Sequence, residues 1–287
     1  MDASEFHYRM PRRVGGARVG SHPGLATGSG GAFVAHTSLF RQPDPRRIDI
    51  RASLRRQVAL DDDWLVRVHR QRSGITLHLV ADVSASMRFG EPQTKLERVA
   101  QFAECLGRSV HRLGDRLGLI AFDAHERGDL HLPAQRSRGT GTAIAAALRQ
   151  APGGAGGLGG LVQASERLAG RDGIVFIASD FHWALDGLDT VLDRLGHAFV
   201  VPMVVWDRAE TAPPRVNGIA PAHDAETHAR RTLWLRPIVR QRWSAGVAQR
   251  RAELERRFAS RGLRPFWMDG GFDADAMSRH FLEAGAI

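Results

Sequence analysis

The sequence predicts an α/β fold, a doubly wound and mostly parallel sheet with an N-terminal β-rich extension. From residue 73 onward, short runs of nearly unbroken apolar residues alternate with longer segments whose apolar residues recur at helical spacing. Such runs are typical of strands buried on both faces by helices, as in parallel sheets. Residues 1–72 lack this alternation. We therefore expect an extended, β-rich arm over 1–72 and one large domain over 73–287.

Within the arm, Gly- and Ser-rich sequence is followed by two stretches that alternate like short strands. These are "RRIDIRASLRRQ" at 46–57 and "DWLVRVHRQ" at 63–71. Alternation with a period of two residues indicates strands that are buried on one face. The arm is therefore expected to be built from short strands.

The large domain opens with a β-branched apolar run, "GITLHLVA", at 74–81. Apolar residues at helical spacing then predict a helix over 96–113. The elements expected after it are a strand at 116–122 with a hairpin partner at 129–134, helices near 142–149 and 160–169, a strand at 174–178, a helix at 184–195, a strand at 198–206, a long amphipathic helix at about 240–261, the apolar stretch 264–268 and a closing helix from about 273. Prolines between 212 and 221 indicate an irregular insertion at about 207–237.

The net charge of +9 raises the question of nucleic-acid binding, because arginines that neutralise phosphates drive such binding. Of the 40 basic residues only Lys95 is a lysine, and the arginines are spread over the whole chain beside acidic residues. This distribution favours a solvated surface over a nucleic-acid interface.

The sequence predicts a cytoplasmic protein without a membrane span. A single cysteine, Cys105, allows no internal disulfide, and the first twenty residues hold no apolar stretch of the kind that a secretory signal needs. The longest apolar segments, at 75–81 and 198–206, fall well short of the roughly twenty residues that cross a bilayer.

Oxygen-bearing side chains gather where the first strand of the large domain ends. Asp82, Ser84 and Ser86 occupy every second position, with only small residues between them. In doubly wound sheets, ligands bind beyond the carboxyl ends of the strands. A curled loop can bring the three oxygens to one point, and hard oxygen donors suit Mg²⁺, Mn²⁺ or Ca²⁺ better than zinc.

One carboxylate leaves a divalent ion short of charge, so other segments must contribute. Asp180 closes the strand at 174–178, and Thr142 stands at the start of a predicted helix, where Thr140 competes with it for the ligand role. Each of these residues alone is also a common helix cap. His182 and Trp183, just past Asp180, are candidates for the rim of the site.

The pattern Asp-x-Ser-x-Ser, a later Gly-Thr before a helix and an Asp closing a later strand resembles the metal-ion-dependent adhesion site of von Willebrand factor A domains. Over nearly the whole chain, "PDPRRIDIRAS", "VRVHRQRSGITLHLVADVSASM" and "GDRLGLIAF" resemble the bacterial MoxR-associated von Willebrand A proteins. The resemblance implies a metal held by Asp82, Ser84, Ser86, Thr142 and Asp180.

The same resemblance implies a role in protein binding. A partner protein would complete the metal shell with an acidic side chain, and a MoxR-type AAA+ ATPase would be a second partner. Such proteins are thought to help assemble or activate enzyme complexes, including methanol oxidation in methylotrophs.

The sequence favours a binding protein over an enzyme. Phosphatases with a nucleophilic Asp at such a strand end generally have a second acid two residues later, where this chain has Ser84. It also contains no Gly-x-Ser-x-Gly elbow. The alternatives are an Arg-rich nucleic-acid-binding protein and a metal-dependent hydrolase.

Overall fold

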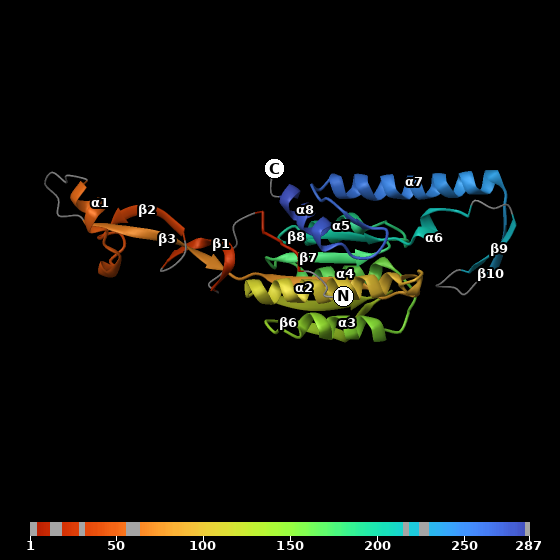
Figure 1. The fold of residues 1–287 in the computed structure, drawn as a ribbon, viewed down its shortest axis with the longest axis horizontal. Helices are drawn as coiled ribbons and strands as arrows, with labels where there is room; N and C mark the ends of the chain where they lie inside the picture. Colours follow the sequence, from red (N-terminus) through yellow and green to blue (C-terminus); the bar gives the residue numbers. More distant parts are fainter. Residues whose placement is uncertain are drawn as a thin grey trace. The chain divides into compact units, whose positions relative to one another are not determined.

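The computed structural model describes residues 5–11, 19–28, 32–55, 64–214, 218–223 and 230–284. The chain divides into two compact units (Figure 1). The smaller unit is Arg12–Ile75, and the larger unit combines Met1–Pro11 with Thr76–Ile287.

The larger unit is built on a six-stranded sheet with the order β11-β8-β7-β4-β5-β6. All neighbouring pairs are parallel except β5 and β6, which run antiparallel. The prediction of a mixed α/β fold with a mostly parallel sheet is therefore confirmed. The strands are β4 (Thr76–Asp82), β5 (Arg116–Phe122), β6 (Glu126–Gln135), β7 (Ile174–Ser179), β8 (Phe199–Val205) and β11 (Phe266–Met268).

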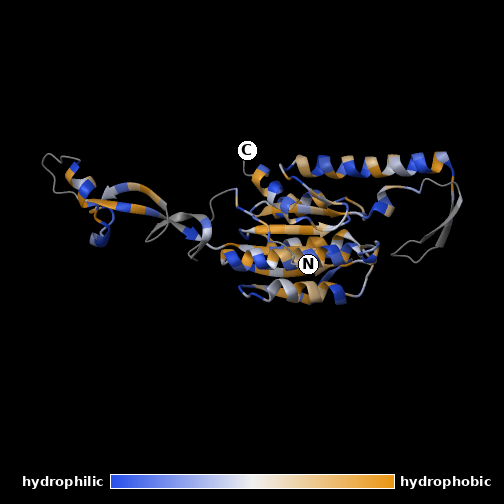
Figure 2. Ribbon diagram, in the orientation of Figure 1, coloured by the Kyte–Doolittle hydropathy of each residue, from blue (hydrophilic) through white to orange (hydrophobic). Residues whose placement is uncertain are grey.

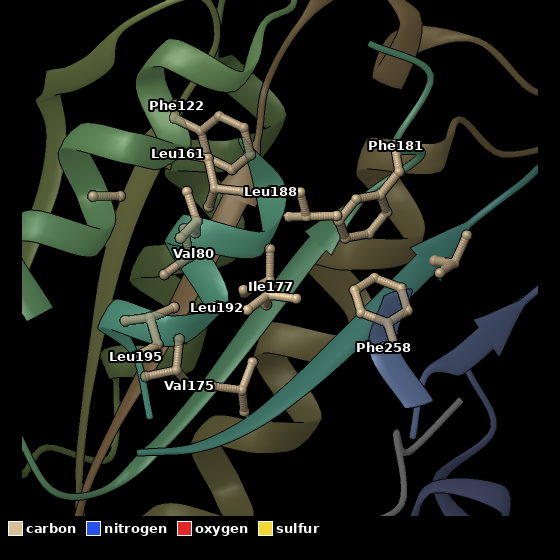
Figure 3. Packing of buried hydrophobic residues seen from close by; sticks show 14 of the residues in the cluster. Val80, Phe122, Leu161, Val175, Ile177, Phe181, Leu188, Leu192, Leu195 and Phe258 are labelled. Carbon is tan, nitrogen blue, oxygen red and sulfur yellow. The ribbon is translucent and has the colours of Figure 1, made fainter. Parts of the chain in front are cut away.

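Helices cover both faces of this sheet, as the side-chain alternation of β7 shows. Val175 and Ile177 face a core that includes side chains of α4 (Leu158–Leu168), α5 (Leu188–Arg194) and α7 (Pro237–Ala259) (Figure 3). Phe176 points to the other face, where its ring centroid lies 5.0 Å from that of Phe102 in α2 (Lys95–Leu113) and 6.1 Å from that of Phe281 in α8 (Ala274–Ala284). The central strands are correspondingly apolar, whereas α7 is banded with hydrophilic residues (Figure 2).

The direction of β6 determines where α3 (Thr140–Gln150) begins. Because β6 is antiparallel to β5, its last residue, Gln135, pairs with Leu117 at the amino-terminal edge of the sheet. From there α3 runs antiparallel to α2: Gly141 packs against Gly107, and Arg149 pairs with Glu97 at 2.8 Å.

The smaller unit holds an antiparallel sheet in the order β1-β3-β2, formed by β1 (Val19–Gly28), β2 (Ala32–Ser38) and β3 (Leu65–Ser73). Between β2 and β3 lie η1 (Pro45–Arg47) and α1 (Ile50–Arg55). The strand expected over 46–57 is therefore corrected to helix within the described residues. Asp49 explains the difference, because its Oδ1 accepts the backbone N–H of Ala52 at 3.0 Å and so caps α1.

Residues 5–11 belong to the larger unit, in contrast to the arm expected over 1–72. The Phe6 side chain is fully buried, and its ring stacks on Phe102 with centroids 5.8 Å apart. Its backbone N–H donates to Ser109 Oγ at 3.0 Å, and the Tyr8 hydroxyl donates to Asp115 at 2.6 Å. Composition could not show this, because the partners lie about a hundred residues further along the chain.

The expected irregular insertion contains regular structure. Over 207–237, α6 (Arg208–Thr211) is followed by the antiparallel pair β9 (Gly218–His223) and β10 (Arg230–Leu235). α7 then begins at Pro237, whose fixed φ suits the first helical turn. Among the described helices, none is both long and apolar enough to cross a bilayer.

Candidate metal centre

Two buried carboxylates meet where the winding of the sheet reverses. The chain leaves β4 toward β5 on one side, and β7 lies on the other side of β4. Asp82 is the last residue of β4, and Asp180 directly follows β7, so both lie at the carboxyl edge of adjacent parallel strands. The two residues are 1% and 0% exposed. The structure thus places both where a doubly wound sheet binds its ligands.

Asp82 is held by three donors. Its Oδ1 accepts the Ser84 N–H at 2.9 Å, and its Oδ2 accepts the Ser179 hydroxyl at 2.7 Å and the Trp183 indole N–H at 3.2 Å. Burial and the neighbouring charge of Asp180 nevertheless raise the pKa of Asp82 to about 6. A cation placed between the two carboxylates would relieve this repulsion.

The two serines are positioned by the loop that follows β4. Ser84 precedes the short 3₁₀ helix η2 (Ala85–Arg88), which carries Ser86 in its first turn. The two hydroxyl oxygens lie 3.2 Å apart. Ligands of an octahedral Mg²⁺ at about 2.1 Å stand about 3.0 Å apart along an edge, so this spacing suits two ligands of one ion.

A buried lysine, Lys95 at the start of α2, contacts Asp180. The Lys95 Nζ donates to Asp180 Oδ2 at 2.7 Å and to Glu210 Oε1 at 2.6 Å, and the Lys95 side chain is fully buried. Burial raises the pKa of Asp180, but the charges of Lys95 and His182, together with hydrogen bonds from Lys95 and Ser86, outweigh this effect, so that the pKa lies below its ordinary value. Burial raises the pKa of Glu210 as well, but the nearby His182 and Lys95, together with the backbone N–H of Asp207, outweigh it, so that this pKa also lies below its ordinary value.

The charges of this group leave room for a divalent cation. Ionised Asp82, Asp180 and Glu210 contribute three negative charges against the single positive charge of Lys95, which leaves two negative charges in a buried site. Oxygen donors with this net charge fit a hard divalent ion such as Mg²⁺.

One ligand atom each from Asp180, His182 and Glu210 lie within 4.8 Å of one another, which is close enough to share a metal ion. His182 Nε2 lies 3.7 Å from Glu210 Oε2, and the His182 ring stacks on Trp206 with centroids 5.9 Å apart. His182 therefore lies beside a further carboxylate, that of Glu210, which the sequence did not indicate.

The structure does not bring Thr142 to this group. Gly141 packs against Gly107, twelve residues after Lys95 in α2, which corresponds to about 18 Å along the helix axis. Thr142 is exposed there, and Thr140 is buried with its hydroxyl unpartnered among the described residues. The expected ligand role of Thr142 is corrected accordingly, because α3 starts at the opposite edge of the sheet.

In place of Thr142, the glycine-rich stretch after α3 contacts the loop after β4. The Ala85 N–H donates to the carbonyl of Gly154 at 2.8 Å, and the Arg88 guanidinium donates to the carbonyl of Ala151 at 2.8 Å. A Cβ at Gly154 would lie 2.4 Å from Asp123 Oδ2, so any larger residue would have to displace the Asp123 side chain.

The loop that carries Asp180 is pinned from α7. The Arg250 guanidinium donates to the carbonyl of Phe181 at 2.6 Å and also to that of Trp183. Phe181 adopts φ of 53°, a left-handed conformation that is uncommon for a residue with a side chain. Such strain persists where surrounding contacts impose it, often at functional sites.

Of the residues in the centre, sequence reasoning missed Lys95 and Glu210. The one signal for Lys95 was its position as the single lysine among forty basic residues. Glu210 lies inside the segment expected to be irregular, where the capping box of α6, with Asp207 as N-cap, and the hydrogen bond from Lys95 hold it in place.

The family model described as "Protein of unknown function DUF58" matches residues 43–253, and the chain belongs to this family. No curated protein matches the chain at a significant level. Similar solved structures include an aerotolerance-related membrane protein from Bacteroides fragilis, with 11% identity and a TM-score of 0.43 over 74% of this chain and 99% of that one. They also include the conserved hypothetical protein BatB from Bacteroides thetaiotaomicron, with 14% identity and a TM-score of 0.43 over 75% of this chain and 100% of that one.

Proposed function

We propose that this DUF58 protein is a non-enzymatic adaptor that binds a partner protein through a divalent cation. The observation that carries the proposal is the convergence of Ser84, Ser86 and two buried carboxylates at the reversal point of the sheet. Doubly wound sheets bind their ligands at this edge.

In this proposal Ser84, Ser86 and Asp180 coordinate the cation, and Asp82 balances its charge without coordinating it directly. Asp82 suits the second role because three hydrogen bonds from the protein already orient its oxygens. When bound, Mg²⁺ or a similar ion supplies a coordination position for an incoming carboxylate. The arrangement resembles a metal-ion-dependent adhesion site that lacks the threonine.

The partner expected is an acidic side chain of another protein, and the resemblance to MoxR-associated proteins adds a MoxR-type AAA+ ATPase in the cytosol. Assembly or activation of an enzyme complex, such as methanol dehydrogenase, is the corresponding role. The surface arginines support protein binding over nucleic-acid binding, because many of them are paired with acids, as Arg149 is with Glu97 and Glu104.

Metal binding is tested with Mn²⁺, whose free ion is counted by electron paramagnetic resonance. The wild type is expected to bind one equivalent, and Ser84→Ala with Ser86→Ala to weaken binding at least tenfold while the circular dichroism spectrum stays unchanged. Ser137→Ala, at an exposed serine of the same unit, is the matched control. Equal Mn²⁺ binding by the wild type and the double variant would contradict the proposal.

The partner is tested with the purified MoxR-type ATPase of the same genome. Its complex with this protein is expected to form in Mg²⁺, to dissociate in EDTA and to be lost in the double serine variant. A complex that survives both treatments would exclude the metal-mediated contact. Turnover of a generic phosphoester that disappears in Asp82→Asn would favour the hydrolase alternative instead.

A further inference from the structure

A cavity of about 300 Å³ lies beside the candidate metal centre. Its walls come from the loop after β7, from the end of β8 with α6, and from the middle of α7. His182 and Glu210 line the cavity and also belong to the group that can share a metal ion. The cavity therefore borders the candidate metal centre through these two residues.

Aromatic side chains form much of the cavity wall, and their polar atoms are already bonded. The Trp206 indole N–H donates to the carbonyl of Asp180 at 2.8 Å, and the Trp243 indole N–H donates to the carbonyl of Glu210 at 2.6 Å. The His182 ring lies nearly parallel to Trp206, at an interplanar angle of 12°. The carbon surfaces of these rings are left to line the space, and their bonds to the metal-centre backbone hold them in place.

The cavity lining carries two arginines and one carboxylate, that of Glu210, which is already paired with Lys95. Arg242 lines the cavity, is exposed, and has no carboxylate partner among the described residues. Arg250 lines it as well and is only partly neutralised by Glu253, from which its guanidinium is 3.4 Å away. A partner segment that enters here is favoured if it carries negative charge, and arginine planes also pack well against aromatic rings.

The cavity is large enough for one aromatic side chain and lies at the lower limit for larger ligands. An engineered cavity of about 150 Å³ holds benzene, whereas drug-sized ligands need sites of about 300–1,000 Å³. The space observed suits one phenyl or indole ring of a partner, and ring-lined walls favour an aromatic occupant.

We propose that this cavity receives an aromatic side chain of a partner segment whose adjacent acidic residue reaches the metal centre. The binding of the acidic residue at the metal centre rests on the proposed function. The binding of the aromatic residue, here called the aromatic half of the inference, rests on the cavity alone. The expected partner segment therefore carries an aromatic residue next to an Asp or Glu, and an acidic surface alone does not suffice.

Gly246 allows a clean test. It lines the cavity, and a Cβ built there meets nothing within 4 Å, so Gly246→Leu introduces a larger side chain at the cavity wall with room at its Cβ. Gly246→Ala is the matched control, because it changes the helix backbone in the same way and leaves the cavity open. Both variants are checked by circular dichroism.

The probes are three capped dipeptides, acetyl-Trp-Glu-amide, acetyl-Trp-Gln-amide and acetyl-Ala-Glu-amide, titrated in Mg²⁺ and in EDTA. In Mg²⁺, acetyl-Trp-Glu-amide is expected to bind at least tenfold more tightly than either of the others. Gly246→Leu should remove the advantage over acetyl-Ala-Glu-amide, and Gly246→Ala should keep it. The indole N–H resonances of Trp206 and Trp243 should shift on binding, which provides a readout that needs no variant.

Failure of the cavity and failure of the metal site give different results. Equal binding of acetyl-Trp-Glu-amide and acetyl-Ala-Glu-amide in Mg²⁺, with unshifted indole resonances, overturns the inference while metal-dependent carboxylate binding stands. Trp peptides that bind equally in Mg²⁺ and EDTA, and that lose binding in Gly246→Leu, overturn the metal contact and uphold the aromatic half.

Discussion

The ammonium of Lys95 lies 2.7 Å from Asp180 Oδ2, and both side chains are buried. This lysine also contacts Glu210, so one cation from the protein already neutralises part of the candidate metal centre. The remaining two negative charges are those that a divalent ion would balance. The stability of the fold and the affinity for metal are therefore coupled at this residue.

Replacing the lysine tests that coupling. Lys95→Met leaves two carboxylates without their cation, and breaking a buried pair typically costs about 3–5 kcal/mol. Urea unfolding in EDTA should show this loss, and Mg²⁺ at about a hundred times its Kd should recover about 2.7 kcal/mol. Glu210→Gln added to Lys95→Met should restore part of the stability. A Lys95→Met protein as stable as the wild type in EDTA would show that the pair contributes nothing.

The pKa of Asp82 predicts an unusual pH dependence. Its value of about 6 lies above the ordinary 3.8, because the side chain is buried beside Asp180. Between these values the folded state keeps a proton that the unfolded chain has released, so stability falls as pH rises from about 4 to about 6. The test compares the free energy of unfolding of the wild type with that of Asp82→Asn in EDTA. The difference, wild type minus variant, should fall by at most about 1.4 kcal/mol per pH unit between about pH 4 and about pH 6.

The control for this titration is the same pair of proteins in Mg²⁺. A bound cation favours the ionised carboxylate and should flatten the difference. A difference that does not change with pH in EDTA would assign the ionisation to another group.

Arg250 is expected to hold the loop of Asp180 in its binding conformation. Arg250→Lys loses the fork that bonds the carbonyls of Phe181 and Trp183, and a buried carbonyl left without a partner costs about 1–3 kcal/mol. Amide exchange over 181–185 should accelerate at least tenfold, and Mn²⁺ affinity should fall. Arg256→Lys, at an exposed arginine of the same helix, is the control. Unchanged exchange in Arg250→Lys would show that other contacts fix the loop.

The contact between α2 and α3 tests the placement of Thr142. A Cβ at Gly141 would lie 2.6 Å from the carbonyl oxygen of Ala103, so Gly141→Ala must separate the helices and should cost about 1–3 kcal/mol in thermal or urea unfolding. Gly139→Ala, where a Cβ meets nothing within 4 Å, should be nearly neutral. Equal effects of the two substitutions would show that α3 does not pack so closely on α2.

Asp82 and Asp180 were predictable together because each closes an apolar strand. Parallel strands end at one edge of the sheet, so local sequence sufficed to place both carboxylates. Ser84 and Ser86 followed from their nearness to Asp82. Thr142 was misplaced because its ligand role rested on the Gly-Thr motif before a helix. The antiparallel hairpin of β5 and β6 returns the chain to the amino-terminal edge of the sheet, so the helix that begins with this motif starts away from Asp82 and Asp180.

The sequence by itself thus determined the alternation of strands and helices, the mostly parallel sheet and the oxygen-rich loop after β4, since all of these depend on neighbouring residues. Only the tertiary structure decided that Lys95 and Glu210 join Asp180, that Thr142 stays away, and that Phe6 packs on Phe102. These contacts join residues that are far apart in the chain, and their energies depend on burial and charge that exist only once the sheet and helices have packed.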